Sequence, residues 1–248
     1  MEETIIRLAG LPVRFLCHSY KTIQYLRRYL PKDAPEESEA EYTVDSRNID
    51  LTQLSLDELL NNPYNEYCYL IEVATDVLMT ARRCFFHGVV FVWKEKAWIL
   101  TAPSGTGKST QYKNLRELYR DDVFCLNGDK PCMEICEDGT VKVYDSPWRG
   151  KEGWGTAEAI YPLEGIFYLK QADENRIRKL SVDEAVVPLY WKFFSSRTTT
   201  IICHQISRLE DILIRNIPIY LLENKGDLES TRLLYQTLEQ LYNEHNAG

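Results

Sequence analysis

The spacing of apolar residues along the chain predicts strands and helices in mixed order. Residues 4–17 alternate between apolar and polar side chains and turn near Gly10, which is the pattern of a β-hairpin. Ser19 follows as the N-cap of a helix that runs to about Leu30. Residues 31–41 are rich in Pro, Glu and Ser and predict a surface loop. The chain therefore begins with a small layer of strands and one helix.

The same patterns give the remaining elements. Helical spacing of apolar side chains predicts a helix over residues 64–79, and the connection before it, residues 48–63, is polar and predicts no regular element. Runs of β-branched and aromatic residues predict strands at 42–44, 84–93, 96–101, 123–127, 132–136, 141–144, 163–169 and 218–222. Further helices are expected at 108–119, 181–194, 204–215 and 227–243.

This order of elements also predicts the architecture. Hairpins and helices do not alternate as regular βαβ units, so the pattern favours an α/β fold with a mixed sheet over a doubly wound parallel one. A boundary near residue 80 divides the chain into a small α+β N-terminal region, residues 1–80, and a second domain, residues 81–248.

One junction in this pattern carries a motif with defined chemistry. The strand at 96–101 leads into a loop that opens the helix at 108–119, and the loop resembles G-x-x-x-x-G-K-[ST] with Ala102 in place of the first glycine. Its glycines let backbone N–H groups turn around a phosphate, and the helix adds its positive N-terminal end. An ordinary strand-loop-helix turn is the alternative. The residues predicted to bind nucleotide are Ser104, Gly105, Thr106, Gly107, Lys108, Ser109 and Thr110.

Asp129 follows the apolar strand predicted over 123–127. A carboxylate at the end of a strand beside a phosphate loop can coordinate Mg²⁺ or accept a proton from an attacking hydroxyl. A simple Asn-Gly-Asp turn is the alternative. His87 lies in the strand predicted over 84–93, which could run beside the strand that leads into the loop. It could hold or relay a proton from Asp129, although a histidine beside aromatic residues is usually part of the core.

The segment 145–155 holds two cations, Arg149 and Lys151, among Trp, Pro and Gly residues. This composition favours a loop that closes over phosphoryl oxygens and neutralises charge in the transition state. A solvated basic turn is the alternative.

The amino-acid composition argues against some classes of binding partner. The chain has 29 Lys and Arg against 37 Asp and Glu, and its net charge of −8 disfavours nucleic acid and anionic membranes as general partners. No apolar run is long enough to span a bilayer, and the acidic N-terminus is unlike a signal peptide. We therefore expect a cytoplasmic protein.

The loop at 102–109, the stretches around His87 and Asp129, and the segment 145–155 together resemble the HPr kinase/phosphorylase and PEP carboxykinase-like superfamily. The resemblance is strongest to its short HPr-kinase-related members, some of which phosphorylate ribosomal peptide precursors. The resemblance covers about residues 82–170 and rests on His87-Gly88, residues 102–109 and Gly128-Asp129. It implies an HPr kinase/PEP carboxykinase-like P-loop domain with a mixed β-sheet. It also implies that Asp129 is the base, that His87 supports it and that Ser109 helps to hold Mg²⁺.

The chain departs from this family in ways that bear on function. HPr kinases carry two adjacent aspartates at the strand end, whereas Lys130 follows Asp129 here, which puts one metal ligand and the reverse phosphorolysis in question. The glycine-rich signature of their carboxyl half has no clear counterpart, so HPr itself is disfavoured as a substrate. Full carboxykinases are about twice as long, which disfavours decarboxylation of oxaloacetate.

The sequence as a whole predicts an ATP- and Mg²⁺-dependent kinase that transfers the γ-phosphoryl group to a hydroxyl, with a serine of a peptide or protein as the favoured acceptor. Lys108, Arg149 and Lys151 would neutralise charge during transfer, with Mg²⁺ held by Ser109 and Asp129. A small-molecule hydroxyl kinase on the same scaffold and a non-catalytic nucleotide- or peptide-binding module are the alternatives. The acceptor, a homo-oligomeric state and the role of residues 1–80 are left open.

Overall fold

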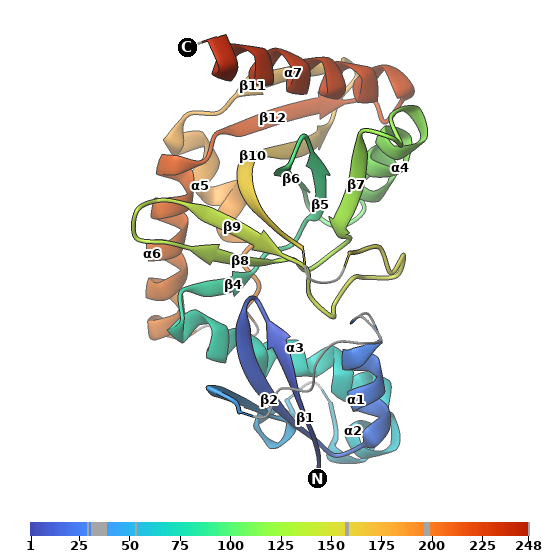
Figure 1. The fold of residues 1–248 in the computed structure, drawn as a ribbon, viewed down its shortest axis with the longest axis vertical. Coiled ribbons are helices and arrows are strands. Elements are labelled where there is room, and N and C mark those ends of the chain that lie inside the picture. Colours follow the sequence, from blue (N-terminus) through green and yellow to red (C-terminus); the bar gives the residue numbers. More distant parts are fainter. Residues whose placement is uncertain (29, 31–38, 53, 157–158, 196–198, 248) are drawn as a thin grey trace.

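The structure is a computed structural model that describes all residues except 29, 31–38, 53, 157–158, 196–198 and 248. Its described strands form a three-stranded sheet in the N-terminal part and a nine-stranded mixed sheet in the remainder (Figure 1). The predicted mixed α/β architecture is therefore confirmed at the level of its sheets and helices. None of the described helices has both the length and the apolar character that crossing a bilayer requires.

The N-terminal sheet begins with the predicted hairpin, in which β1 (Glu2–Leu8) and β2 (Leu11–Cys17) run antiparallel. Ala9 and Gly10 form its two-residue turn, and both have positive φ angles, 50° and 80°, as a tight hairpin turn requires. The side chain of Ser19 caps α1 (Tyr20–Arg27), which ends before the expected Leu30. The predicted third strand, β3 (Tyr42–Asp45), pairs with β2 in parallel. Most of the predicted loop at 31–41 lies outside the described residues.

The prediction that residues 48–63 form an irregular connection is wrong in part. After a short 3₁₀ turn, η1 (Ser46–Asn48), it contains α2 (Leu56–Asn61). Ser55 and Glu58 form a reciprocal capping box at its start, a signal that is visible in the sequence as Ser-x-x-Glu. The next helix, α3 (Pro63–Thr80), confirms the helix predicted at 64–79 and packs against α1, β3 and β4.

The nine-stranded sheet has the order β4-β8-β9-β10-β6-β5-β7, with β12 paired to β10 and β11 paired to β12. Its strands are β4 (Arg83–Phe85), β5 (Val89–Trp93), β6 (Lys96–Thr101), β7 (Val123–Asn127), β8 (Cys132–Ile135), β9 (Val141–Tyr144), β10 (Ile160–Gln171), β11 (Arg176–Lys179) and β12 (Ile219–Asn224). The prediction of a single strand at 84–93 is wrong. The strand pairing is interrupted at Phe86-His87-Gly88, and the chain forms two strands, β4 and β5. Strand β11 was not predicted from the sequence.

The long strand β10 connects the two halves of this sheet. Its first residues pair antiparallel with β9, its middle pairs in parallel with β6, and its end pairs in parallel with β12. Because β6, β10 and β12 are parallel, their carboxyl ends lie at one edge of the sheet. The predicted phosphate loop leaves the sheet at this edge, after Thr101.

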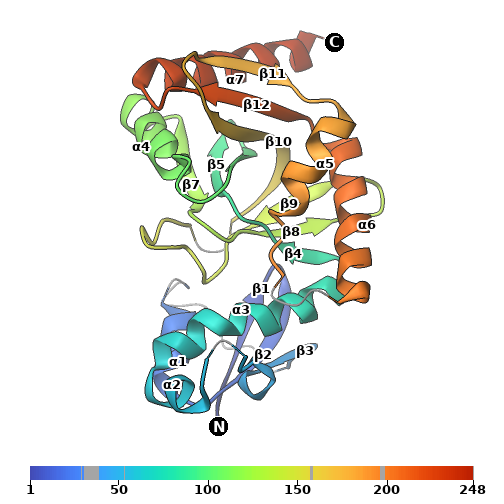
Figure 2. The ribbon, with the colours of Figure 1, turned by 180° about the vertical axis from the view of Figure 1, so that it is seen from behind.

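Two pairs of helices cover the opposite faces of the sheet (Figures 1 and 2). The helices α5 (Val182–Tyr190) and α6 (Thr200–Asn216) pack on the face that holds Val90 and Ile99. The helices α4 (Lys108–Leu118) and α7 (Leu228–Ala247) pack on the face that holds Phe91 and Leu100. Alternation along β5 and β6 therefore supplies two separate apolar cores.

A third apolar cluster joins the N-terminal region to the large sheet. It is built mainly from residues between Ile6 and Phe85, and it also takes in Cys132, Tyr144 and Trp148. Apolar contacts therefore continue across the boundary predicted near residue 80, and that boundary stays a prediction.

Glu210 is an exception to the apolar face that α6 turns to the core. Glu210 is 4% exposed, and its neighbours along the same helix, Ile206, Leu209 and Leu213, are buried as well. Its Oε1 atom has no hydrogen-bond partner among the described residues. Burial raises the pKa of Glu210 to about 7, so the folded protein keeps this carboxyl protonated where the unfolded chain has already ionised it.

Folding stability should therefore depend on pH through Glu210. Its ordinary pKa is 4.5, so the free energy of unfolding should fall as the pH rises from about 4.5 to about 7. Glu210→Gln keeps the shape of the side chain and cannot ionise, and should be more stable than the wild type at pH 8 by on the order of 1–3 kcal/mol. Urea unfolding at pH 4, 6 and 8 measures this gain, which should shrink towards pH 4. Glu239→Gln, at an exposed position of α7, is the matched control, and a gain that does not vary with pH would contradict the assignment.

Candidate active site

The predicted phosphate loop connects β6 to α4 at the carboxyl edge of the sheet. Gly105 and Gly107 have φ angles of +79° and +106°, which side chains with a Cβ rarely adopt. A Cβ at either position would meet nothing within 4 Å, so the protein leaves open space beside both glycines. Gly107 is the N-cap of α4 and gives no side-chain cap, which leaves the first N–H groups of the helix free for an anion.

Lys108 begins α4 and is buried. Its Nζ atom donates to the carbonyl oxygens of Ala102 at 3.1 Å and Pro103 at 3.3 Å. Burial is the main cause that lowers the pKa of Lys108 to about 8, and the positive charge of Lys192 is the next. Within the loop, Ser104 and Gly105 are exposed, Thr106 and Ser109 are half-buried, and Thr110 is exposed. These residues lie between the end of β6 and the first turn of α4, as the strand-loop-helix pattern predicted, and their role in nucleotide binding stays a prediction.

The crossing from β4 to β5 brings His87 to the same edge. The His87 N–H donates to the carbonyl of Lys192 at 2.7 Å, and the His87 carbonyl accepts from the Thr101 hydroxyl at 2.7 Å. The N–H of Gly88 donates to the carbonyl of Asp129 at 3.0 Å. Backbone bonds therefore hold the crossing to the end of β6, to the turn after β7 and to the segment after α5.

Asp129 lies in the turn after β7. Its N–H donates to the side-chain oxygen of Asn127 at 2.9 Å, which fixes the turn. The Oδ1 atom of Asp129 is 3.5 Å from Nε2 of His87, and Oδ2 accepts from Nζ of Lys130 at 3.0 Å. The two residues that the sequence proposed as base and support, Asp129 and His87, are therefore neighbours.

The environment of His87 keeps its imidazole neutral near pH 7. Burial first, and then the charges of Lys130 and Lys108, lower the pKa of His87 to about 4, with the charge of Asp129 acting in the opposite direction. A neutral imidazole has one donor and one acceptor nitrogen, so it can hold a neighbouring carboxyl or pass on a proton.

Two lysines of this site were missed as functional candidates. Lys130 was noted only as a departure from a family pattern, yet its side chain is mostly buried against Asp129. Lys192 lies outside every motif and comes from the residues that follow α5. Its charge acts on both His87 and Lys108. The site thus gathers three amines and one carboxylate, and this excess of positive charge suits a bound phosphate.

The segment 145–155 does not form the closing loop that the sequence suggested. It packs on the turn after β7, where the N–H groups of Gly128 and Lys130 donate to the carbonyls of Trp154 and Trp148. Gly150 is also in close contact with Asp129, because a Cβ there would lie 2.8 Å from the Asp129 Cβ. The segment is therefore a packed wall beside Asp129, and it reaches α4 through an ion pair between Glu152 and Lys113.

The two cations of this segment differ. The guanidinium of Arg149 pairs with Asp145, and both side chains are 7% exposed. Burial raises the pKa of Asp145 to about 6, against the opposing effects of Arg149 and Asn127. Arg149 would have to leave this buried pair to reach a phosphate. Lys151 is exposed and forms no ion pair with the residues that the structure describes.

The residues proposed for Mg²⁺ provide two oxygen ligands, the Ser109 hydroxyl and the Asp129 carboxylate. Mg²⁺ commonly takes one or two protein oxygens and completes its shell with phosphate oxygens and waters, so this donor set fits a metal that arrives with a nucleotide. No cluster of three or more His, Cys, Asp or Glu residues that could hold a metal occurs in the described part of the chain. The Lys130 ammonium competes with the metal for Asp129.

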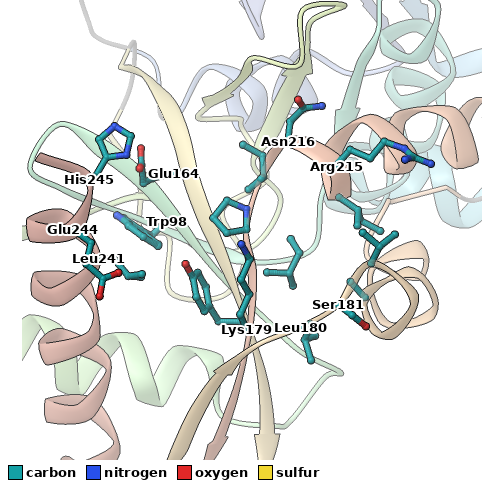
Figure 3. A pocket seen from close by; sticks show the side chains of 17 residues that line it. Trp98, Glu164, Lys179, Leu180, Ser181, Arg215, Asn216, Leu241, Glu244 and His245 are labelled. Atoms are coloured by element: carbon teal, nitrogen blue, oxygen red, sulfur yellow. The ribbon is translucent and has the colours of Figure 1, made fainter. Parts of the chain in front are cut away.

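A cavity of about 460 Å³ lies at the other end of the sheet (Figure 3). It is lined by residues at the start of β6, β10 and β12, among them Trp98, Glu164 and Ile219, and by the ends of α6 and α7. Parallel strands separate this end from the phosphate loop. We place the candidate site at the loop, because the open helix N-terminus, the amines and the His87–Asp129 pair converge there.

Comparisons with known proteins do not assign the chain to a family. No family model matches it, and no curated protein matches it. Among solved structures, it is similar to the Hpr(Ser) kinase/phosphatase from Coxiella burnetii, with 13% sequence identity and a TM-score of 0.36 over 66% of this chain and 99% of that chain. This likeness assigns no activity to the chain.

Proposed function

We propose that this chain is an ATP- and Mg²⁺-dependent kinase that transfers the γ-phosphoryl group to a hydroxyl. The observation that supports it is the convergence of the open phosphate loop with the His87–Asp129 pair at one edge of the sheet. Hydrogen bonds from Thr101 to His87 and from Gly88 to Asp129 join the strand before the loop to the turn that holds the carboxylate. A phosphate site and a proton acceptor side by side are the two parts that phosphoryl transfer to a hydroxyl needs.

Each residue then has a distinct role. The N–H groups at the start of α4 hold the phosphates, and Lys108 exchanges the carbonyls of Ala102 and Pro103 for phosphate oxygens. Asp129 accepts the hydroxyl proton as the acceptor oxygen bonds to the γ-phosphorus and the bond to the ADP oxygen breaks. His87, neutral and 3.5 Å away, positions the carboxylate. Mg²⁺ held by Ser109 and Asp129 would neutralise charge on the phosphates.

A serine of a peptide or protein is the acceptor that the resemblance of the motifs favours. A metabolite hydroxyl would use the same chemistry, so assays should include both free serine and serine-containing peptides.

One observation favours a non-catalytic nucleotide-binding module as the second candidate. The ammonium of Lys130 lies 3.0 Å from Oδ2 of Asp129. Lys130 stands where the HPr kinases that the motifs resemble have a second aspartate. The Lys130 ammonium occupies a carboxylate oxygen that an acceptor hydroxyl or Mg²⁺ would otherwise contact. A module of this kind would bind ATP and form neither ADP nor a phosphorylated product.

Substitutions in the loop and at the base should separate binding from transfer. Lys108→Ala removes a phosphate ligand and should weaken binding of a non-hydrolysable ATP analogue by roughly a hundredfold, measured by calorimetry. Asp129→Asn should bind the analogue within about threefold of the wild type and lower ADP formation by about 10²- to 10⁴-fold. Asp121→Asn, at an exposed position before β7, is the matched control. Full turnover in Asp129→Asn would remove the proposed base.

The two cations of the segment 145–155 should behave differently. Arg149→Met leaves Asp145 buried without its partner and should lower the melting temperature by roughly 10 °C. The double variant with Asp145→Asn should recover part of this loss. Lys151→Met should leave the melting temperature unchanged and lower the transfer rate by about tenfold, because an exposed amine can reach a phosphate without breaking a buried pair. A stable, fully folded Arg149→Met protein would contradict the structural role given to this pair.

A further inference from the structure

Lys192 is a buried lysine without an acidic partner. Its residue is 6% exposed, and no carboxylate of the described residues forms an ion pair with its amine. Burial alone lowers the pKa of Lys192. Its Nζ atom is not among the fully buried, unpaired polar atoms of the described residues, so the stem of the side chain is packed while the amine stays accessible to a ligand of opposite charge.

The backbone holds Lys192 firmly in place. The Lys192 N–H donates to the carbonyl of Leu189 at 2.8 Å, at the end of α5, and the Lys192 carbonyl accepts from His87. The next two residues pair with the crossing beside β4, since Phe193 forms a bridge with Phe86 and the Phe194 N–H donates to the carbonyl of Phe85 at 2.9 Å. This short ladder extends the sheet up to His87, so Lys192 is fixed next to the proposed support of the base.

The side chain of Lys192 lies at the edge of the sheet from which the phosphate loop leaves. Its Nζ atom is 5.7 Å from the centre of the Tyr168 ring. Tyr168 on β10 is paired in register with Thr101, the last residue of β6 before the loop. Lys192 is thus connected to the loop strand through Tyr168 and to the proposed base through His87.

We propose that Lys192 binds the terminal phosphoryl group of the nucleotide, the group that is transferred. This inference rests on the proposed function and assigns the ligand of one further residue. The loop N–H groups and Lys108 hold the phosphates from the side of α4. Lys192 lies on the other side, with His87 and Asp129, where the acceptor hydroxyl would approach. Of the three phosphates, only the terminal one would lie between α4 and this side. The oxygens of this group would supply the charge that the amine lacks.

The test compares Lys192→Met, Lys192→Arg and the control Lys179→Met, an exposed lysine at the opposite end of the sheet. Calorimetry at fixed ionic strength measures affinity for a non-hydrolysable ATP analogue and for ADP, each with Mg²⁺. Lys192→Met should bind the triphosphate analogue about ten- to a hundredfold more weakly and ADP within about twofold of the wild type. Lys192→Arg should recover most of the loss, and Lys179→Met should match the wild type.

Thermal unfolding without nucleotide separates this role from a structural one. Removal of an unpaired charge that acts on Lys108 and His87 should raise the melting temperature of Lys192→Met by about 2–4 °C, whereas loss of a structural lysine would lower it. The inference is overturned by a lower melting temperature, by unchanged affinity for the triphosphate analogue, or by equal losses for ADP and the analogue. A wild-type chain that binds neither nucleotide would instead overturn the proposed function itself.

Discussion

The site depends on how closely the crossing at His87-Gly88 approaches the strand that leads into the phosphate loop. A Cβ at Gly88 would lie 2.6 Å from a methyl group of Ile99 and 3.0 Å from the carbonyl of Leu100, so the backbone can pass here only as glycine. This passage lets Thr101 bond to His87 and lets Gly88 bond to Asp129. The mutual positions of the loop, the imidazole and the carboxylate follow from these contacts.

Charge at the site is unbalanced, and this imbalance has a physical consequence. Amines from three distant parts of the chain surround one carboxylate and a neutral imidazole. Without an anion, such a group of positive charges opposes folding, and it is compensated only by what binds there. Buried polar groups that reduce stability are expected where a protein binds or reacts with a ligand. The same imbalance adds to burial, the larger cause, in lowering the pKa values of His87 and Lys108.

The N-terminal region is connected to this site through aromatic side chains. Tyr67 of α3 stacks on Trp148 and donates its hydroxyl to the carbonyl of Pro147, while the Trp148 indole donates to the carbonyl of Tyr67. Trp148 belongs to the segment that packs against the turn holding Asp129. The first 80 residues therefore support one wall of the candidate site, in addition to any contact with an acceptor.

The sequence by itself determined what depends on neighbouring residues. The hairpin, the Ser19 cap, most helices and strands, and the loop between β6 and α4 follow from local spacing, and α2 could have been found from its Ser-x-x-Glu box. The pairing of His87 with Asp129 was suggested by the resemblance of the motifs to HPr kinases. The break of the strand at His87 was not, because it arises from packing against residues 192–194, which are distant in the sequence.

Only the tertiary structure decided which charges are free and which are paired. Arg149 looked available in the sequence and is buried against Asp145, whereas Lys192 had no motif and lies beside His87. The spacing of apolar and polar residues indicates which backbone conformation a segment prefers and which face of a strand or helix is buried. Whether a buried charge meets a carboxylate or an open loop depends on contacts between residues far apart in the chain, and only folding brings those together.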